Sequence, residues 1–189
     1  MIAAIVEGLG DDLALNSLMP RIHSGAEITC VPMGGKSNIV REKNGFEETI
    51  IRQNALGHDQ FYVLLDGDVF FPPYANLKEE KEGMAARAQK LSQDERIAVE
   101  VYWAIKVFES WLIGGLRSNH VFCGLRKKLG RIPFDTEVEP VEPVKWLEQR
   151  LKRGHYGHVT QGCLAKYFDI PEARRRNASL EAFCTAFNH

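Results

Sequence analysis

The chain has 189 residues, of which 44% are hydrophobic and 26% are charged, and its formal net charge is −1. This length and apolar content are enough for one packed domain with additions, and they exclude an intrinsically disordered chain. The sequence contains neither an apolar run of about 18 residues nor a basic, cleavable N-terminus, which predicts a cytoplasmic protein without a membrane span.

The chain opens with an apolar segment at 2–6 that is typical of a buried strand. This strand ends at Glu7, and a glycine-containing turn follows. A mostly apolar helix comes next, with Asp11 and Asp12 in its first turn, where the helix dipole favours negative charge. These features predict a β-α unit with a carboxylate at the end of the strand.

A second strand is predicted at 27–32, and the glycine-rich turn that follows it contains Lys36. The GGKS sequence of this turn is similar to the end of a phosphate-binding loop. That motif requires glycine at position 30, where this chain has Cys30, so a nucleotide-binding loop is excluded by the spacing. Lys36 remains either a contact for a phosphate group or an exposed loop lysine. A helix at about 42–56 would then cross back over the sheet.

A short apolar run at 61–65 ends in two carboxylates, Asp66 and Asp68, which are separated by one glycine. The run is typical of a strand covered on both faces. Residues i and i+2 of an extended chain point the same way, so the two carboxylates can face one point. Paired oxygen ligands of this kind suit Mg²⁺ or Mn²⁺. Asp and Gly are also ordinary turn residues, and a solvated turn is the alternative.

The segment 77–95 is dense in Lys, Glu, Gln and Ala, which predicts a charged helix inserted at the rim of the domain. Residues 97–107 then alternate between apolar and other side chains with period two, as expected of a strand. The pattern changes to helical spacing at about Phe108, so Glu109 lies where the strand passes into a helix.

Acidic residues therefore follow three predicted strands: Glu7, the pair Asp66 and Asp68, and Glu109. Open α/β sheets bind their ligands at the carboxyl ends of parallel strands. One shared site is therefore expected on an α/β fold with a mainly parallel sheet of about four or five strands and flanking helices. We assign residues 1–115 to this core and 116–189 to a mostly helical C-terminal extension that caps it.

Charge divides the chain unevenly. Residues 1–110 carry 11 basic and 17 acidic side chains, whereas residues 111–189 carry 13 basic and 8 acidic ones. An acidic first part suits a carboxylate cluster that holds cations, and a basic second part suits a polyanion such as a nucleic acid. Solvated helix faces are the alternative.

The four cysteines are widely spaced and include no CxxC pair; they are Cys30, Cys123, Cys163 and Cys184. This spacing is typical of neither a zinc site nor a secreted disulfide framework. We therefore expect reduced thiols in packed positions.

The order of these motifs resembles the Toprim domain of primases, topoisomerases, overcoming-lysogenisation-defect nucleases and small ribosomal-RNA-maturing ribonucleases. The matching residues are Glu7 with Asp11 four positions later, and the later strand that ends in Asp66 and Asp68. Three further segments, GGKSNI, FESWLIGG and HYGHVTQGCLAKYFDI, are similar to a family of stand-alone Toprim-like proteins of unassigned function found beside phage-defence genes. This resemblance covers nearly the whole chain, although glycine follows the first Asp here and commonly follows the second.

The resemblance implies a metal-dependent nuclease that hydrolyses phosphodiester bonds in DNA or RNA, with a role in phage defence and a partner such as a defence ATPase. It implies Mg²⁺ or Mn²⁺ ligands at Glu7, Asp11, Asp66 and Asp68, with Glu109 as a family-specific catalytic addition. Metal ions held in this way activate water and stabilise the leaving oxygen, and Lys36, or a basic residue such as Lys166, would complete the catalytic set by contacting a phosphate.

Two other functions remain open. D-x-D also holds the diphosphate of sugar nucleotides in many glycosyltransferases, and the second strand with its glycine-rich turn is a candidate cradle for a nucleotide, although Glu7 counts against this function. A non-catalytic module that binds a nucleotide or a partner protein is the other alternative.

Overall fold

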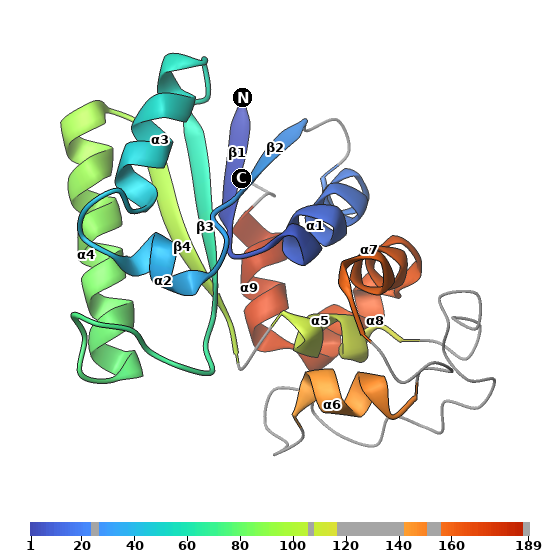
Figure 1. The fold of residues 1–189 in the computed structure, drawn as a ribbon. Coiled ribbons are helices and arrows are strands. Elements are labelled where there is room, and N and C mark those ends of the chain that lie inside the picture. Colours follow the sequence, from blue (N-terminus) through green and yellow to red (C-terminus); the bar gives the residue numbers. More distant parts are fainter. Residues whose placement is uncertain (24–26, 106–107, 117–141, 151–155, 187–189) are drawn as a thin grey trace.

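The described residues of the computed structural model are 1–23, 27–105, 108–116, 142–150 and 156–186. They form a sheet of four parallel strands in the order β2-β1-β3-β4, with helices on both faces (Figure 1). The strands are β1 (Ile2–Val6), β2 (Ile28–Pro32), β3 (Gln60–Asp66) and β4 (Ala98–Ala104). The predicted α/β class, with a parallel sheet and flanking helices, is confirmed.

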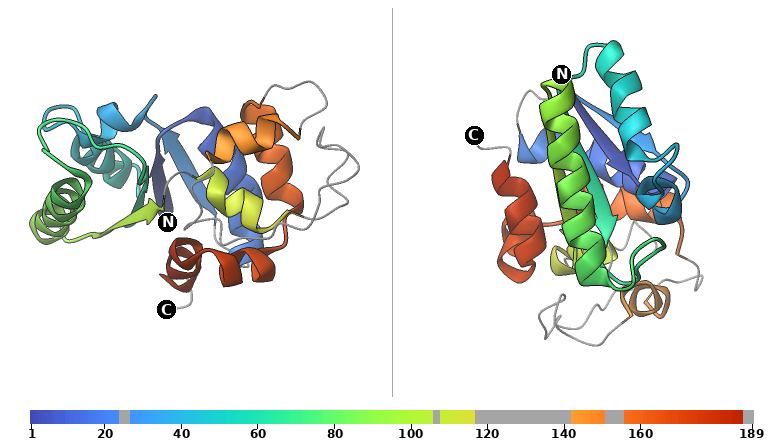
Figure 2. Two further views of the ribbon diagram at one scale, coloured as in Figure 1. Left: turned by 90° about the horizontal axis from the view of Figure 1, so that it is seen from below. Right: turned by 90° about the vertical axis from the view of Figure 1, so that its left-hand side faces the viewer.

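The helices form one layer on each face of the sheet, as Figure 2 shows. The first layer consists of α2 (Lys36–Val40), α3 (Phe46–Ala55) and α4 (Leu77–Glu95). The second layer consists of α1 (Leu9–Ile22), α5 (Glu109–Gly114), α6 (Pro143–Glu148), α7 (His158–Tyr167), α8 (Ile170–Arg176) and α9 (Ala178–Ala186).

Successive side chains of each central strand enter different cores, because neighbouring residues of a strand point to opposite faces. In β1, Ala3 and Ile5 pack with α2, α3 and α4, whereas Ala4 and Val6 pack with the second layer. Both faces of the central strands are covered, which explains why their sequences are continuous apolar runs.

The charged helix predicted at 77–95 has those bounds as α4, but it is not an insertion at the rim. It connects β3 to β4 and packs on the sheet through its sparse apolar residues, Met84, Ala88 and Leu91. Asn76 caps its N-terminus by accepting a hydrogen bond from the backbone N–H of Glu79 at 2.9 Å.

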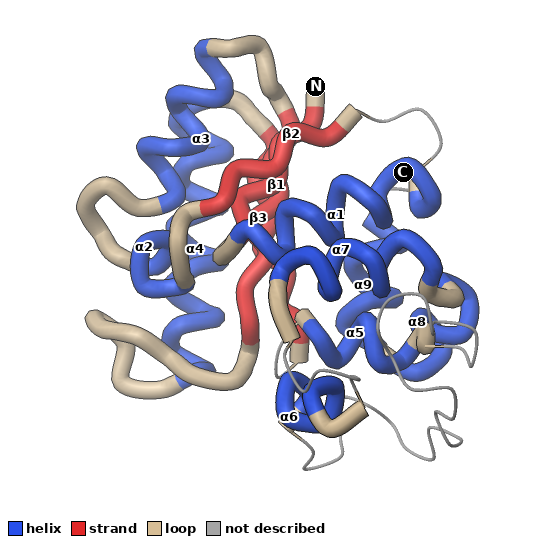
Figure 3. Tube along the Cα trace, turned by 45° about the vertical axis from the view of Figure 1, so that its right-hand side comes forward, coloured by secondary structure: helices blue, strands red, loops and turns tan. Residues whose placement is uncertain are grey.

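The C-terminal helices complete the second layer, and α7 lies beside α1 (Figure 3). Arg21 near the end of α1 connects the two, because its guanidinium donates to three carbonyl oxygens at 2.6–2.9 Å; these belong to Ala165, Lys166 and Phe168. The described part of the predicted extension 116–189 therefore covers one face of the sheet. Residues 117–141, next to the predicted domain boundary, lie outside the described residues.

The expectation of reduced thiols is wrong for Cys163, which is disulfide-bonded, whereas Cys30 and Cys184 are reduced thiols as expected. Within the described ranges, no helix combines the length and the apolar character that a membrane span requires.

Candidate functional site

The carboxyl ends of β1, β3 and β4 lie at one edge of the sheet, and acidic residues follow there as predicted. Strands β1 and β3 pair in parallel with Ile5 opposite Val63, and Asp66 at the end of β3 lies opposite Ala104 of β4. Glu7 comes directly after β1, and Glu109 is the first residue of α5. The parallel pairing therefore brings Glu7, Asp66 and Glu109 to the same edge.

Asp66 forms hydrogen bonds with the segment after β1 and with the segment before α5. Its backbone N–H donates to Glu7 Oε1 at 2.8 Å, and its Oδ1 accepts a hydrogen bond from the backbone N–H of Phe108 at 2.7 Å. Each of the two carboxylates thus receives one backbone hydrogen bond through one oxygen. Their second oxygens, Glu7 Oε2 and Asp66 Oδ2, accept none from the described residues, which leaves them available to a ligand.

Asp11 joins this cluster from the first turn of α1. Its Oδ2 accepts the backbone N–H of Gly8 at 3.0 Å, which caps the helix, and its Oδ1 accepts Nε2 of Gln161 at 2.8 Å. Gln161 belongs to α7 and is buried, with 5% of its surface exposed. The close contact between α1 and α7 therefore decides the orientation of Asp11.

Gly10 allows this contact, and its replacement tests it. A Cβ atom at Gly10 would lie 1.9 Å from Gln161 Oε1 and 2.7 Å from its Cδ. We expect Gly10→Ala to push Gln161 away from Asp11 and to lower the free energy of unfolding by about 1–3 kcal/mol in urea titrations. Gly162→Ala in the same interface is the matched control, because its nearest contact would be Leu13 Cβ at 3.1 Å. Equal stability of the two variants would contradict this account.

The carboxylates of the cluster hold their protons more tightly than usual. Burial, strengthened by the charge of Asp11, raises the pKa of Glu7 and that of Glu109 each to about 7. Burial and the charges of Glu7, Glu109 and Asp11 raise the pKa of Asp66 well above its usual range. Burial also raises the pKa of Asp11, against the hydrogen bonds from Gly8 and Gln161. These mutual effects place the four side chains within electrostatic reach of one another.

Glu109 has a neighbour that the sequence did not identify. The hydroxyl group of Tyr156 lies against its carboxylate and lowers the pKa of Glu109, in opposition to burial. The same hydroxyl is buried and, among the described residues, has no partner at hydrogen-bonding distance and angle. Burial and the charge of Glu109 raise the pKa of Tyr156. Tyr156 is therefore a neutral group beside Glu109.

Asp68 differs from the other acidic residues because it is exposed. It lies in the loop after β3, where its Oδ1 accepts the backbone N–H of Val69 at 2.7 Å. Its charge reaches Glu7 and Glu109, whose pKa values it raises. In the described ranges, however, no three Asp, Glu, His or Cys side chains are arranged to hold a metal ion. The structure therefore shows an acidic cluster and not an assembled coordination sphere. This is expected because the carboxylates repel one another and N–H donors hold one or both oxygens of Glu7, Asp66 and Asp11.

Of the two roles that the sequence allows for Lys36, a phosphate contact or an exposed loop lysine, the structure excludes the second. Lys36 begins α2 and is 4% exposed. Its ammonium group donates to the carbonyl oxygen of Asp66 at 2.7 Å and to that of Val69, and lies 3.4 Å from Glu80 Oε1. Lys36 thus lies beside the cluster, and its ammonium group points into the protein, where it contacts Asp66, Val69 and Glu80.

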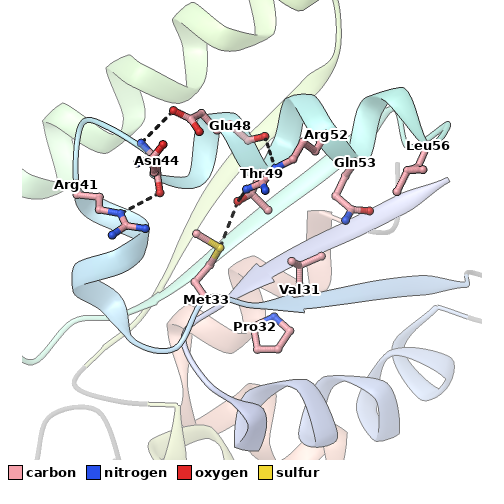
Figure 4. A pocket seen from close by; sticks show the side chains of 10 residues that line it. All are labelled: Val31, Pro32, Met33, Arg41, Asn44, Glu48, Thr49, Arg52, Gln53 and Leu56. Atoms are coloured by element: carbon pink, nitrogen blue, oxygen red, sulfur yellow. Dashed lines mark hydrogen bonds between the residues drawn. The ribbon is translucent and has the colours of Figure 1, made fainter.

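A separate pocket of about 580 Å³ lies between β2 and α3 (Figure 4). It is lined by Val31, Pro32, Met33, Arg41, Asn44, Glu48, Thr49, Arg52, Gln53 and Leu56. The predicted catalytic and metal-binding residues are not among them. The pocket nevertheless adjoins the cluster, because the backbone N–H of Met33 donates to the carbonyl of Val6, directly before Glu7.

The structure therefore brings together Glu7, Asp11, Asp66 and Glu109, as the sequence predicts, and adds Gln161 and Tyr156, which the sequence did not indicate. Gln161 and Tyr156 both lie in HYGHVTQGCLAKYFDI, a segment that the sequence connects with the site only through the family resemblance. Comparison of the chain with protein-family models, with curated proteins and with solved structures yields no match.

Proposed function

We propose that this protein is a Toprim-like, metal-dependent nuclease that hydrolyses phosphodiester bonds in DNA or RNA. The observation that carries this proposal is the acidic cluster, in which Glu7, Asp66, Glu109 and Asp11 have raised pKa values. Four segments of the chain contribute to it, at the sheet edge where parallel α/β folds bind ligands. Perturbed carboxylates gathered in this way are typical of functional sites.

The donor set fits a hard divalent cation. Carboxylate oxygens are the ligands that Mg²⁺ and Mn²⁺ prefer, and a cation relieves the repulsion that raises the pKa values. The proposed ligands are Glu7, Asp11, Asp66 and Asp68, of which Asp68 can turn toward the cluster because it is exposed. When bound, the metal would lower the pKa of a water molecule and stabilise the charge on the leaving oxygen.

The side chains around this centre have separate roles in the proposal. Glu109, with a pKa of about 7, is suited to accept a proton from the attacking water near neutral pH. Tyr156 keeps Glu109 in place from the buried side. Gln161 orients Asp11 and leaves its remaining lone pairs for the cation. A serine, cysteine or histidine nucleophile is not needed in this scheme.

The pocket between β2 and α3 supports one alternative, a module or transferase that binds a nucleotide or a sugar nucleotide. It lies where the second strand meets the glycine-rich turn, and it contains the guanidinium groups of Arg41 and Arg52. Against this alternative, the acidic cluster lies outside the pocket, and Glu48 lines it together with the two arginines.

Titration of the native protein with Mg²⁺ and Mn²⁺ in a calorimeter, followed by assays with labelled DNA, RNA and sugar nucleotides, tests the proposal. We expect metal binding and metal-dependent cleavage of at least one nucleic acid. Binding of a nucleotide or sugar nucleotide that Arg52→Ala weakens, without cleavage of any nucleic acid, would favour the alternative. Absence of metal binding would refute the nuclease proposal.

A further inference from the structure

We infer that Lys36 and the glycine turn before it position the acidic ends of β1 and β3, and that Glu80 holds Lys36 in place. Lys36 is a positioning residue in this role, because its ammonium group contacts backbone and not substrate. The consequence for metal binding rests on the proposed function, whereas the anchoring of the two strand ends does not.

The ammonium group of Lys36 holds the loop that carries Asp68. It donates to the carbonyl oxygen of Asp66 at 2.7 Å and to the carbonyl oxygen of Val69. These two carbonyls lie on either side of Asp68. Fixing both of them restricts the backbone dihedral angles of the residues between them, and hence the directions that the exposed Asp68 carboxylate can take.

The turn before Lys36 holds the other strand end. The backbone N–H of Gly35 donates to the carbonyl of Glu7 at 2.7 Å. Gly34 and Gly35 have φ angles of 75° and 122°, in the region that side chains other than glycine rarely adopt. Two consecutive residues, Gly35 and Lys36, thus contact the backbone at both Glu7 and Asp66, which are proposed ligands from different strands.

Glu80 explains why a charged group can stay at this buried position. Its side chain is completely buried, and its Oε1 lies 3.4 Å from Lys36 Nζ. The Trp103 ring covers the ammonium group at 4.9 Å from its centroid. Two carbonyls, one carboxylate and one aromatic ring therefore surround Nζ, as a buried cation requires. A compact ammonium group with three donors suits this arrangement of acceptors.

The double variant Lys36→Met/Glu80→Met separates positioning from stability. Lys36→Met alone leaves Glu80 buried without its partner and should lower the melting temperature, and removal of both charges should restore much of it. If Lys36 served stability alone, the double variant would also bind metal like the native protein. We expect the Mn²⁺ dissociation constant of the double variant to be about tenfold or more above that of the native protein. Loss of groups that orient metal ligands has effects of this size.

Amide hydrogen exchange in metal-free protein tests the anchoring directly. The backbone N–H groups of Asp66, Gly67 and Val69 donate to Glu7, Ala104 and Asp68, and they report on the order of this segment. We expect exchange at these amides to be faster by about tenfold or more in the double variant, because the loop loses its anchor.

Arg87→Met/Glu47→Met is the matched control. Arg87 is paired with Glu47 at 2.5 Å and donates to the carbonyls of Val40 and Arg41, so it also combines an ion pair with two backbone contacts. These contacts lie at the C-terminal end of α2, away from the acidic cluster. We expect this control to lose stability but to keep native exchange at Asp66 to Val69 and native Mn²⁺ affinity.

Unchanged exchange in Lys36→Met/Glu80→Met, or Mn²⁺ binding as tight as in the native protein, would overturn the inference. If the native protein binds no Mn²⁺, the proposed function fails, and the exchange measurement alone decides whether Lys36 anchors the strand ends. Faster exchange would then support the anchoring, and native exchange would refute it.

Discussion

Asp66→Asn and Glu7→Gln should each abolish most of the metal-dependent cleavage while leaving the fold intact. Loss of a group that merely orients a metal ligand costs about 10–100-fold, so loss of a ligand's charge should cost at least about 100-fold. The amide oxygens of the new residues can still accept the backbone hydrogen bonds from Phe108 and Asp66. Cleavage rates and Mn²⁺ titrations, with circular dichroism as a check of folding, measure these effects.

Asp12→Asn is the matched control for these two variants. Asp12 is the neighbour of Asp11 on α1, but its Oδ1 accepts a hydrogen bond from Asn16 at the surface. This variant makes the same change of charge one residue from the cluster and should cleave at the native rate. Native activity in Asp66→Asn and Glu7→Gln would exclude the acidic cluster as the catalytic centre.

Glu109→Gln distinguishes a catalytic role from a structural one within the same series. If Glu109 takes part in proton transfer, the variant should lose cleavage while it still binds Mn²⁺. If Glu109 only stabilises the first turn of α5, the change should cost about 1 kcal/mol in the free energy of unfolding and little of the rate.

The second large effect should be a stability that falls as the pH rises and that divalent metal restores. The pKa values of Glu7 and Glu109 are about 7 in the folded protein, against 4.5 for an ordinary glutamate. Between these values the folded state binds more protons than the unfolded state, so the free energy of unfolding decreases with rising pH. The decrease is complete about one pH unit above these pKa values and should amount to several kcal/mol for the two groups together, since each pKa unit corresponds to about 1.4 kcal/mol.

Urea unfolding in EDTA at pH 5 and at pH 8 measures this decrease. Added Mn²⁺ should stabilise the protein much more at pH 8, where the carboxylates are charged, than at pH 5. Glu7→Gln isolates the contribution of the cluster from that of other titrating groups, because its stability should depend less on pH than that of the native protein. A metal effect of equal size at both pH values, or an unchanged pH dependence in Glu7→Gln, would contradict this interpretation.

The sequence alone was sufficient for the main elements of the fold because their signals are local. The predicted strand at 2–6 has the bounds of β1, and the helix predicted at 77–95 has those of α4. A short apolar run between turn residues and a helix dense in Lys, Glu, Gln and Ala are both recognisable within a short segment. The positions of Glu7, Asp66 and Glu109 at one edge follow from the same local pattern, because the carboxyl ends of parallel strands meet at the same edge of a sheet.

Only the tertiary structure decided what surrounds these residues. Lys36 follows two glycines in a polar turn, which is the pattern of an exposed residue, yet Glu80 and the carbonyl of Asp66 hold it inside the protein. Gln161 lies 150 positions after Asp11, and its hydrogen bond exists because Gly10 lets α7 approach α1. A burial pattern or a strand end is a property of a short segment, whereas a partner is a property of packing between distant segments. For this reason the acidic residues could be predicted from the sequence, and the side chains that orient them could not.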